Sequence, residues 1–466
     1  MKESSGMKVV KFGGSSLADA EHYQEVIAIL NADHERRIVV VSAPGKRSEK
    51  DTKVTDLLIK YATGTFMEAR KALNSVIERY RAIANDFEVD EEAFRPIKQY
   101  LVDLPDFEYS SPEAQLARFK AAGERLNAEL LAVVLSKVGL TSRFIDPSEL
   151  GIIVDGDYNN AVVNRGTYQN IAKKRDQLLE TRDLLVVPGF YGYNKNNEVA
   201  TFSRGGSDIT GAILANGFAA EYYENFTDVD SIYSANPKVI KNPHPIDEMT
   251  YREMRELSYA GFSVFHDEAI IPAIEGRVPI VVKNTNHPEA VGTSIVPEDE
   301  FNAKGPVTGV ASSKRFAALY LHRYLLNREV GFTLKLLQIL YKYNISYEHM
   351  PSGIDDLTVI FDRNQIDYTI LPSLLTDIHD ELQTDQLEWI DDYAIIMVVG
   401  EGMRNKVGTV DRIVSALAQN KIGVQMINQG ASRISIMLGV RQSQVDDAVQ
   451  YIYEEFFKKD GVESND

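Results

Sequence analysis

The chain has 466 residues, which is enough for two to four domains, and its composition of 44% apolar and 25% charged residues is ordinary for a soluble globular protein. Fifty Lys and Arg residues against 68 Asp and Glu residues give a formal charge of −18, which disfavours nucleic acid or an anionic membrane as the main partner. The sequence has no cysteine, no apolar leader and no apolar stretch of membrane-spanning length, so we expect a cytoplasmic protein without disulfides, thiolate metal sites or cysteine nucleophiles.

Residues 1–297 alternate short apolar runs with amphipathic segments. The apolar runs predict strands at Lys8–Phe12, Arg37–Val41, Leu184–Val187, Tyr222–Phe226 and Pro279–Lys283. The amphipathic segments predict helices at Asp19–Leu30, Lys53–Tyr61, Ser111–Val138 and Ile209–Asn216, with additional helices between Thr65 and Leu104. This alternation predicts an α/β domain in which helices cover both faces of a mostly parallel sheet.

Four of these strands run into glycine, proline or small polar residues. Turns use the same residue types, so a turn explains any one of the four junctions about as well as a ligand does. In an open α/β sheet, however, ligands bind beyond the carboxyl ends of the strands. The four junctions together therefore predict a binding site at that edge of the sheet.

The first junction carries Lys11, followed by Gly13, Gly14 and Ser15 and then by a helix that starts near Asp19. Glycine lets backbone N–H groups approach phosphate oxygens, and the N-terminus of the next helix favours anions. Lys11 would add a mobile positive charge for a transferred phosphoryl group. A Gly-Gly pair used only for packing is the alternative, and the Walker and protein-kinase signatures are absent from the sequence.

A second candidate lies inside the predicted helix Ser111–Val138, where Glu124 follows Gly123. Glycine in a helix costs about 1 kcal/mol relative to alanine, so its presence indicates a close approach by a ligand or another backbone. A carboxylate beside it could accept a hydrogen bond from an ammonium group. A solvated helix face is the alternative and the more frequent use of glutamate.

Residues 204–208 read Arg-Gly-Gly-Ser-Asp and form the most informative motif of the chain. The planar guanidinium of Arg204 is suited to hold a carboxylate through two parallel hydrogen bonds. Asp208 could orient Lys11 or the shell of a Mg²⁺ ion, or it could cap the following helix, because aspartate is a common N-cap.

The strand Tyr222–Phe226 leads into Thr227 and Asp228, and Tyr233 and Lys238 follow shortly afterwards. These side chains offer hydrogen-bonding groups, a ring and a charge to a nucleotide, and an ordinary acidic turn is the alternative.

Phosphorylating a carboxylate brings two anions together, and unit charges about 4 Å apart repel by about 4 kcal/mol at an effective dielectric of 20. Lys11, Arg204 and Mg²⁺ would neutralise them. We assign no protein ligand to the metal, because ATP and water supply much of its shell.

Residues 297–306 are polar and contain two prolines, which indicates a linker. Beyond it, Phe316–Gly353 superposes on Tyr393–Gly430 without a gap at an offset of 77 residues. Each copy predicts a strand, a glycine turn, an amphipathic helix and further strands, so we expect duplicated small units at residues 310–385 and 390–458. Such units bury little core alone, and we expect them to pack against each other or against another subunit.

Together these motifs closely resemble the aspartokinases of the amino-acid kinase family. The resemblance covers essentially the whole chain, and its motifs are Lys11–Ser16, Ser42-Ala43, Val54–Leu58, residues 204–208, Phe226–Asp230 and Val398–Met403. It implies an amino-acid kinase fold over residues 1–297, followed by two ACT-type, ferredoxin-like regulatory domains of the α+β class in the tandem repeat.

The resemblance also implies an activity, in which ATP, with Mg²⁺, and L-aspartate give ADP and 4-phospho-L-aspartate, the first step of lysine, threonine and methionine biosynthesis. It assigns catalysis to Lys11 and Asp208. It assigns ATP binding to Gly13, Gly14, Ser15, Thr227, Asp228, Tyr233 and Lys238. It assigns aspartate binding to Ser42, Thr55, Glu124, Arg204 and Ser207.

In the repeat the resemblance implies a site for an amino-acid effector, for which lysine is favoured, and a homodimer or tetramer built through the ACT domains. The matching positions are Leu326, Phe332, Thr333, Ser346, Tyr347 and Glu348. Ser263 stands where many aspartokinases carry lysine, and no segment follows the second ACT unit, so we expect no fused homoserine dehydrogenase. Another amino-acid kinase, such as a glutamate kinase, and a non-catalytic amino-acid sensor are the alternative functions.

Overall fold

A computed structural model of the chain describes residues 6–203, 205–262, 265 and 268–458. The chain divides into two compact units, which are considered separately. The first comprises Met1–Ile232, Pro245–Arg255 and Ser263–Phe301, and the second comprises Tyr233–His244, Glu256–Phe262 and Asn302–Asp466.

The first unit is built on an eight-stranded sheet of order β10-β12-β11-β9-β1-β2-β6-β3. Neighbouring strands run parallel except β11 and β12, which are antiparallel. The predicted mostly parallel sheet is therefore confirmed. Its strands are β1 (Lys8–Phe12), β2 (Arg36–Val41), β3 (Ser142–Phe144), β6 (Leu184–Pro188), β9 (Tyr222–Thr227), β10 (Glu248–Thr250), β11 (Ile280–Asn284) and β12 (Thr293–Val296). Two hairpins stand outside this sheet: β4 (Val154–Asp157) with β5 (Asn160–Val163), and β7 (Tyr191–Tyr193) with β8 (Val199–Thr201).

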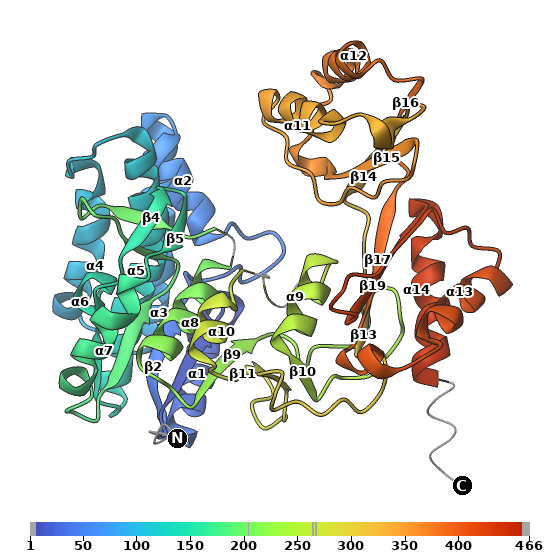
Figure 1. Ribbon diagram of the computed structural model, residues 1–466. Coiled ribbons are helices and arrows are strands. Elements are labelled where there is room, and N and C mark those ends of the chain that lie inside the picture. The colour runs from blue at the N-terminus through green and yellow to red at the C-terminus, as the bar shows by residue number, and fades with distance from the viewer. Residues whose placement is uncertain (1–5, 204, 263–264, 266–267, 459–466) are drawn as a thin grey trace, which may run out of the picture. The chain divides into compact units, whose positions relative to one another are not determined.

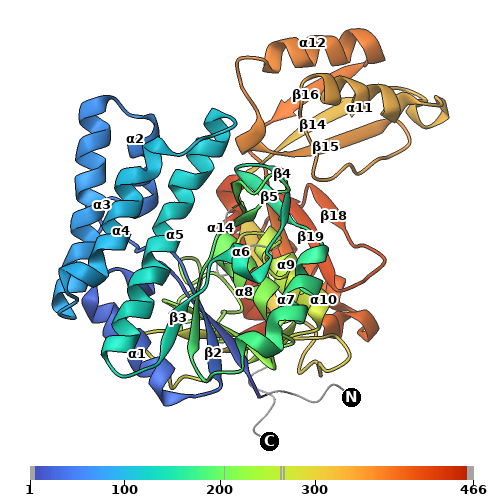
Figure 2. The same ribbon diagram turned by 90° about the vertical axis from the view of Figure 1, so that its left-hand side faces the viewer.

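Helices cover both faces of this sheet, as expected. The helices of this unit are α1 (Ala20–Ala32), α2 (Val54–Thr63), α3 (Phe66–Asp86), α4 (Glu91–Asp103), α5 (Pro112–Lys137), α6 (Pro147–Leu150), α7 (Gly166–Leu178), α8 (Gly206–Gly217) and α10 (Ile271–Gly276), and α9 (Tyr251–Tyr259) runs on into the second unit. Helices α1, α3, α4 and α5 share one apolar core with one face of β1 and β2, while α8 packs on the other face, flanked by α7 and α10. Figure 2 shows these two groups of helices on either side of β2 and β3.

Local sequence explains where several of these helices begin. The Asp19 carboxylate accepts a hydrogen bond from the backbone N–H of His22 and caps α1. Ser111 caps α5 in the same way, with proline at the first helical position, where a missing N–H costs nothing. Helices α3 and α4 are the additional helices predicted between Thr65 and Leu104, and α3 starts with a capping box between Thr65 and Glu68. No helix among the described residues is long and apolar enough to cross a bilayer.

The second unit contains two small α+β layers (orange and red in Figure 1), which confirms the predicted ACT-type architecture. In one, strands β15 (Asp356–Asp362), β14 (Phe316–His322) and β16 (Gln386–Ile390) form a sheet covered by α11 (Phe332–Lys342) and α12 (Leu371–Leu382). In the other, β13 (Gly309–Ser313), β17 (Ala394–Val399), β19 (Ser435–Val440) and β18 (Met426–Asn428) form a sheet covered by α13 (Thr409–Gln419) and α14 (Val445–Tyr453).

The repeat predicted from the sequence is visible in these two layers. Helices α11 and α13 both have 11 residues and start at the positions that the sequence offset equates. Each follows a glycine in the left-handed region, Gly331 at φ 85° and Gly408 at φ 91°. One feature breaks the symmetry, because β13 precedes the first copy in sequence but pairs with β17 of the second.

Candidate active site

The carboxyl ends of four strands lie side by side in the first unit. Phe12 at the end of β1 is in register with Val41 at the end of β2 and with Phe226 near the end of β9. Val41 is in turn in register with Pro188, the last residue of β6. The four junctions singled out in the sequence therefore share one edge of the sheet, where open α/β sheets bind ligands.

Lys11 forms an ion pair with Asp208 at this edge. Lys11 Nζ lies 2.7 Å from Asp208 Oδ1, and both side chains are largely buried, at 10% and 14% exposed. Because successive side chains of a strand alternate between its faces, Lys11 lies on the face covered by α8, opposite its neighbours Val10 and Phe12 in the α1–α5 core. A buried cation held by one short charge-assisted contact is positioned for an anionic ligand.

Asp208 does not cap α8, which answers one alternative left open by the sequence. The helix begins at Gly206 after Gly205, which takes a left-handed conformation at φ 73°, and Asp208 lies in the first turn with its carboxylate directed to Lys11. Ser207 is buried beside Gly189, where an added Cβ would lie 2.6 Å from the Ser207 hydroxyl oxygen. Arg204 and Ser263 lie outside the described residues, so the carboxylate-binding role of Arg204 stays a prediction.

The Gly13-Gly14 loop after β1 is supported by the loop after β2. The N–H of Gly45 donates to the carbonyl oxygen of Gly14 at 2.7 Å. A Cβ on Gly14 would lie 2.8 Å from the carbonyl oxygen of Ala43. Glycine is therefore required at Gly14 by close backbone contact, while Ser15 is exposed in the short 3₁₀ turn that leads towards α1.

Glu124 is buried beside the loop after β2. Glu124 is 6% exposed, the backbone amide of Ala43 donates to its carboxylate, and Oε2 has no hydrogen-bond partner among the described residues. Burial raises the pKa of Glu124 to about 7. Gly123 allows this approach, because a Cβ there would lie 2.8 Å from the Ala43 Cβ. The solvated-face alternative for Glu124 is therefore wrong.

Two further residues predicted to bind aspartate lie close in sequence to these groups. The carbonyl oxygen of Ser42 accepts a hydrogen bond from Asn127 Nδ2 at 2.6 Å, and the Ser42 N–H donates to Phe12. Thr55 is half-buried in the first turn of α2. These two hydrogen bonds hold Ser42 in place, and Ser42 is followed by Ala43, the residue that contacts Glu124 and Gly14.

The residues predicted to bind the nucleotide divide between the two units. Thr227 ends β9, and its hydroxyl donates to the carboxylate of the exposed Asp228 at 3.1 Å. Tyr233 and Lys238 belong to the second unit, where Lys238 is exposed and Tyr233 is half-buried. Their predicted roles stay predictions.

The positions predicted to bind an effector lie in the layer formed by β14, β15 and β16. Leu326 and Phe332 pack into its apolar core, at 7% and 2% exposed, and Thr333 is half-buried in the first turn of α11. The Ser346 hydroxyl donates to Gln365 Oε1, and Tyr347 is 44% exposed. Glu348 Oε2 accepts a hydrogen bond from the hydroxyl of Tyr259 at 2.6 Å. Effector binding by these residues stays a prediction.

One residue of the site escaped the sequence analysis. Asn225 on β9 is in register with Lys11, and its Nδ2 donates to the same oxygen of Asp208 at 3.0 Å. It is 1% exposed, and its Oδ1 has no hydrogen-bond partner in the part of the chain that the structure describes. An amide side chain in a predicted buried strand, directly before Phe226, was the signal available in the sequence. Asn225 completes a Lys11–Asp208–Asn225 cluster.

Comparison with known proteins connects this geometry to a family. Residues 6–284 match the amino acid kinase family, and residues 396–456 match an ACT domain. Aspartokinase 3 of Bacillus subtilis is 47% identical over 456 residues, which cover 97% of this chain and 99% of that protein.

Solved structures lead to the same family. A crystal structure of Clostridium acetobutylicum aspartate kinase superposes with a TM-score of 0.84 at 34% identity, covering 97% of this chain and 100% of that one. Escherichia coli aspartokinase III in complex with aspartate and ADP superposes with a TM-score of 0.78 at 23% identity, covering 96% and 99%, and shows the shared fold alone. The chain belongs to the aspartokinases of the amino-acid kinase family.

Proposed function

We propose that this protein transfers the terminal phosphoryl group of ATP to the β-carboxylate of L-aspartate, giving ADP and 4-phospho-L-aspartate, and so supplies lysine, threonine and methionine biosynthesis. The observation that carries the proposal is the buried Lys11–Asp208 pair at the edge where the strand ends meet. The 47% identity to a Bacillus subtilis aspartokinase over nearly its full length supports aspartate as the acceptor.

The chemistry assigned to the chain is positioning and electrostatic stabilisation. The acceptor carboxylate is its own nucleophile, so no nucleophilic side chain is required. Lys11 would offset the repulsion between the two anions and the charge that develops on the transferred group. Asp208 and Asn225 would hold the Lys11 ammonium in place. Glu124 would receive the aspartate ammonium, and Arg204 its α-carboxylate.

We propose that Mg²⁺ binds together with ATP, and we assign no protein side chain to it as a ligand. Among the described residues, no group of three or more His, Asp or Glu side chains is placed to bind a metal. Magnesium usually keeps several waters and binds phosphate oxygens in such sites. When bound, it would supply charge neutralisation to the phosphates.

The test is ADP release with a panel of acceptors: aspartate, glutamate, N-acetylglutamate, UMP and carbamate. Turnover with aspartate alone is the expected result. Turnover with glutamate instead would favour a glutamate kinase, and no turnover with any acceptor would favour a non-catalytic sensor.

The pKa of Glu124 predicts how aspartate binding depends on pH. The ammonium group of aspartate requires the ionised carboxylate, so kcat/KM for aspartate should fall by up to about ten-fold per pH unit below the pKa of about 7. Glu124→Gln should lower kcat/KM for aspartate at pH 8 and abolish the inflection near pH 7. An unchanged inflection in the variant would refute the assignment.

Glu124→Gln should also change the stability of the protein, and it should raise stability although it lowers activity. Because folding raises the pKa of Glu124 above its unfolded value, the folded state binds more protons between the two values, and stability is lost as pH rises through them. Glu124→Gln removes this loss and should raise Tm at pH 8 relative to the wild type. A variant that binds aspartate poorly yet melts higher is not a misfolded protein.

We also propose feedback control by an amino acid, with lysine favoured, acting on a homodimer or tetramer built through the ACT layers. Support comes from the ACT match and from the acidic Glu348, whose partner Tyr259 a lysine ammonium would displace. Lysine, threonine and methionine should be compared by thermal shift, because a ligand of the folded state raises Tm. A shift with lysine alone is expected, and Glu348→Gln should remove it. The cytoplasmic location stays a prediction.

A further inference from the structure

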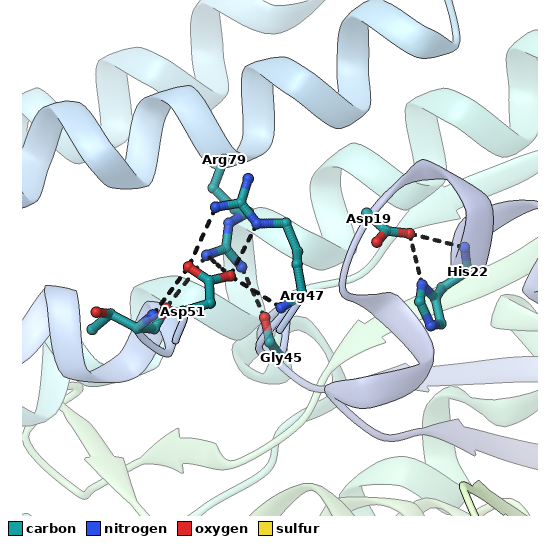
Figure 3. A network of polar contacts seen from close by, with 7 residues as sticks. Asp19, His22, Gly45, Arg47, Asp51 and Arg79 are labelled. Carbon is teal, nitrogen blue, oxygen red and sulfur yellow. Dashed lines mark hydrogen bonds and ion pairs between the residues drawn. The ribbon is translucent and has the colours of Figure 1, made fainter. Parts of the chain in front are cut away.

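Residues 44–53, which form most of the loop between β2 and α2, are held in place by a buried arginine from α3 (Figure 3). Arg79 is 4% exposed, and its Nη1 donates to the carbonyl oxygen of Gly45 at 2.8 Å. Its Nη2 lies 2.6 Å from Asp51 Oδ2 and 3.4 Å from the carbonyl oxygen of Thr52. The Arg79 guanidinium therefore contacts the loop near both of its ends, at Gly45 and at residues 51–52.

Asp51, which lies within the loop, supplies the negative charge that pairs with Arg79. Its carboxylate also accepts hydrogen bonds from the backbone N–H and the Nε of Arg47, at 3.0 and 2.9 Å. The Arg47 hydrogen bond is the largest of the causes that hold the pKa of Asp51 well below its usual range, so the carboxylate stays charged at neutral pH. The Arg47 side chain is half exposed, whereas the Arg79 side chain is buried. Of the two arginines that contact Asp51, Arg79 is therefore the one whose position is fixed by packing.

Arg79 is connected through one residue, Gly45, to the loop after β1, residues 13–15, which is proposed to bind phosphate and is called the phosphate-binding loop. Gly45 accepts from Arg79 and donates its N–H to the carbonyl oxygen of Gly14 at 2.7 Å. The contact between Gly45 and Gly14 leaves no space for a side chain, since a Cβ on Gly45 would lie 2.6 Å from the Gly14 oxygen. A displacement of Gly45 is therefore passed directly to Gly14.

We propose that Arg79, paired with Asp51, is a positioning residue for phosphoryl transfer, which holds Gly45 against Gly14 and so sets the geometry of the phosphate-binding loop. The inference rests on the proposed kinase function and adds to it a residue that touches neither reactant. A buried ion pair is weak support for stability, because an apolar replacement is often as stable. A role in positioning explains why a charged group is enclosed at this point of the fold.

The kinetic test compares Arg79→Lys with Arg81→Lys, a matched control on the same helix. Arg81 pairs with Glu91 and stacks on Phe94, away from the loop. Lysine keeps the charge of residue 79 but cannot make the parallel contacts of a guanidinium. We expect kcat to fall by about ten- to a hundred-fold, as for a small misplacement of reacting groups, while KM for ATP changes by less than about three-fold. Arg81→Lys should leave both within about two-fold of the wild type.

Asp51→Asn is the second variant, since it removes the charge of the partner and leaves Arg79 in place. It should reproduce the kcat defect, and the double variant should be no worse than the poorer single variant, because the two residues act as a unit. Additive losses in the double variant, or a kcat for Arg79→Lys within about two-fold of the wild type, would overturn the proposal. The proposal would also be overturned if the fraction of unfolded protein, measured by thermal melting, accounted for the whole loss in kcat.

A readout without turnover follows the loop itself. The exposed residues Lys46, Arg47, Lys50 and Lys53 are trypsin sites within the loop. Arg79→Lys should speed cleavage there at least several-fold while Arg81→Lys does not, and equal rates would contradict the tether. An inactive wild type on every acceptor would remove the proposed function together with this inference, whereas an active wild type and a fully active Arg79→Lys would remove this inference alone.

Discussion

Replacing Lys11 with methionine is expected to lower kcat by about a thousand-fold, the loss seen when one preorganised charge-stabilising group is removed from an active site. Methionine keeps the length and apolar stem of lysine, so the packing between β1 and α8 is retained. What disappears is the cation 2.7 Å from Asp208 at the edge where β1, β2, β6 and β9 end. Steady-state kinetics with ATP and aspartate measure the loss.

Lys8 provides the control for this prediction, because it lies at the other end of the same strand and pairs with Asp33 and Glu35. Lys8→Met should leave kcat within about two-fold of the wild type, since Lys8 is at the opposite end of β1 from the end that carries Lys11, where Asp208 pairs with it. Asp208→Asn should lower kcat less than Lys11→Met, and the double variant should resemble Lys11→Met alone, because Asp208 is expected to act through the lysine. A Lys11→Met protein with wild-type kcat would remove Lys11 from the mechanism.

Replacing Gly45 with alanine is expected to reduce kcat by about a hundred-fold, again as for a misplacement of about 1 Å. The new Cβ would lie 2.6 Å from the oxygen and 2.7 Å from the carbonyl carbon of Gly14, and 2.9 Å from the nitrogen of Ser15. These are backbone atoms of the loop that is proposed to bind phosphate, so the clash is relieved only if that loop moves. The effect should show in kcat and in the affinity for ADP measured by calorimetry.

Gly423 is the matched control for this steric prediction. A Cβ at Gly423 meets no atom within 4 Å, so Gly423→Ala should leave kcat and ADP affinity at wild-type values. If Gly45→Ala retained both values as well, the loop after β2 would be free to withdraw, and the contact between Gly45 and Gly14 would carry no function.

The five strands predicted for the first unit, and its predicted helices, follow from local patterns in the sequence, whereas short elements such as β3, β10 and α6 were not predicted. The run Lys8–Phe12 forms β1, and the segment from Pro112 to Lys137 forms α5 with the serine cap and proline that mark its start. The repeat places α11 and α13 at equivalent positions. Such features depend on residues within one turn or one strand of each other, so periodicity and capping are sufficient to predict them.

Local sequence patterns did not predict which side chains from distant parts of the chain contact one another in the fold. The sequence left open whether Asp208 orients Lys11, caps the following helix or does both, and the structure shows it paired with Lys11, which is far away along the chain. Asn225 joins them only because β9 is hydrogen-bonded to β1 in one particular register. The pattern of the sequence reports whether a side chain is buried, but the register of distant strands selects its neighbours.

For this protein, local sequence was enough to predict the α/β architecture and the duplicated ACT-type units, which the structure confirms, because both depend on short-range patterns. The phosphate-handling site is also predicted from short-range patterns and stays a prediction. Only tertiary packing decided that Glu124 is buried with a raised pKa, and that Arg79 donates a hydrogen bond to Gly45, whose N–H in turn donates to Gly14. The physical reason is that desolvation and close backbone contact arise only when segments distant in the chain are brought together.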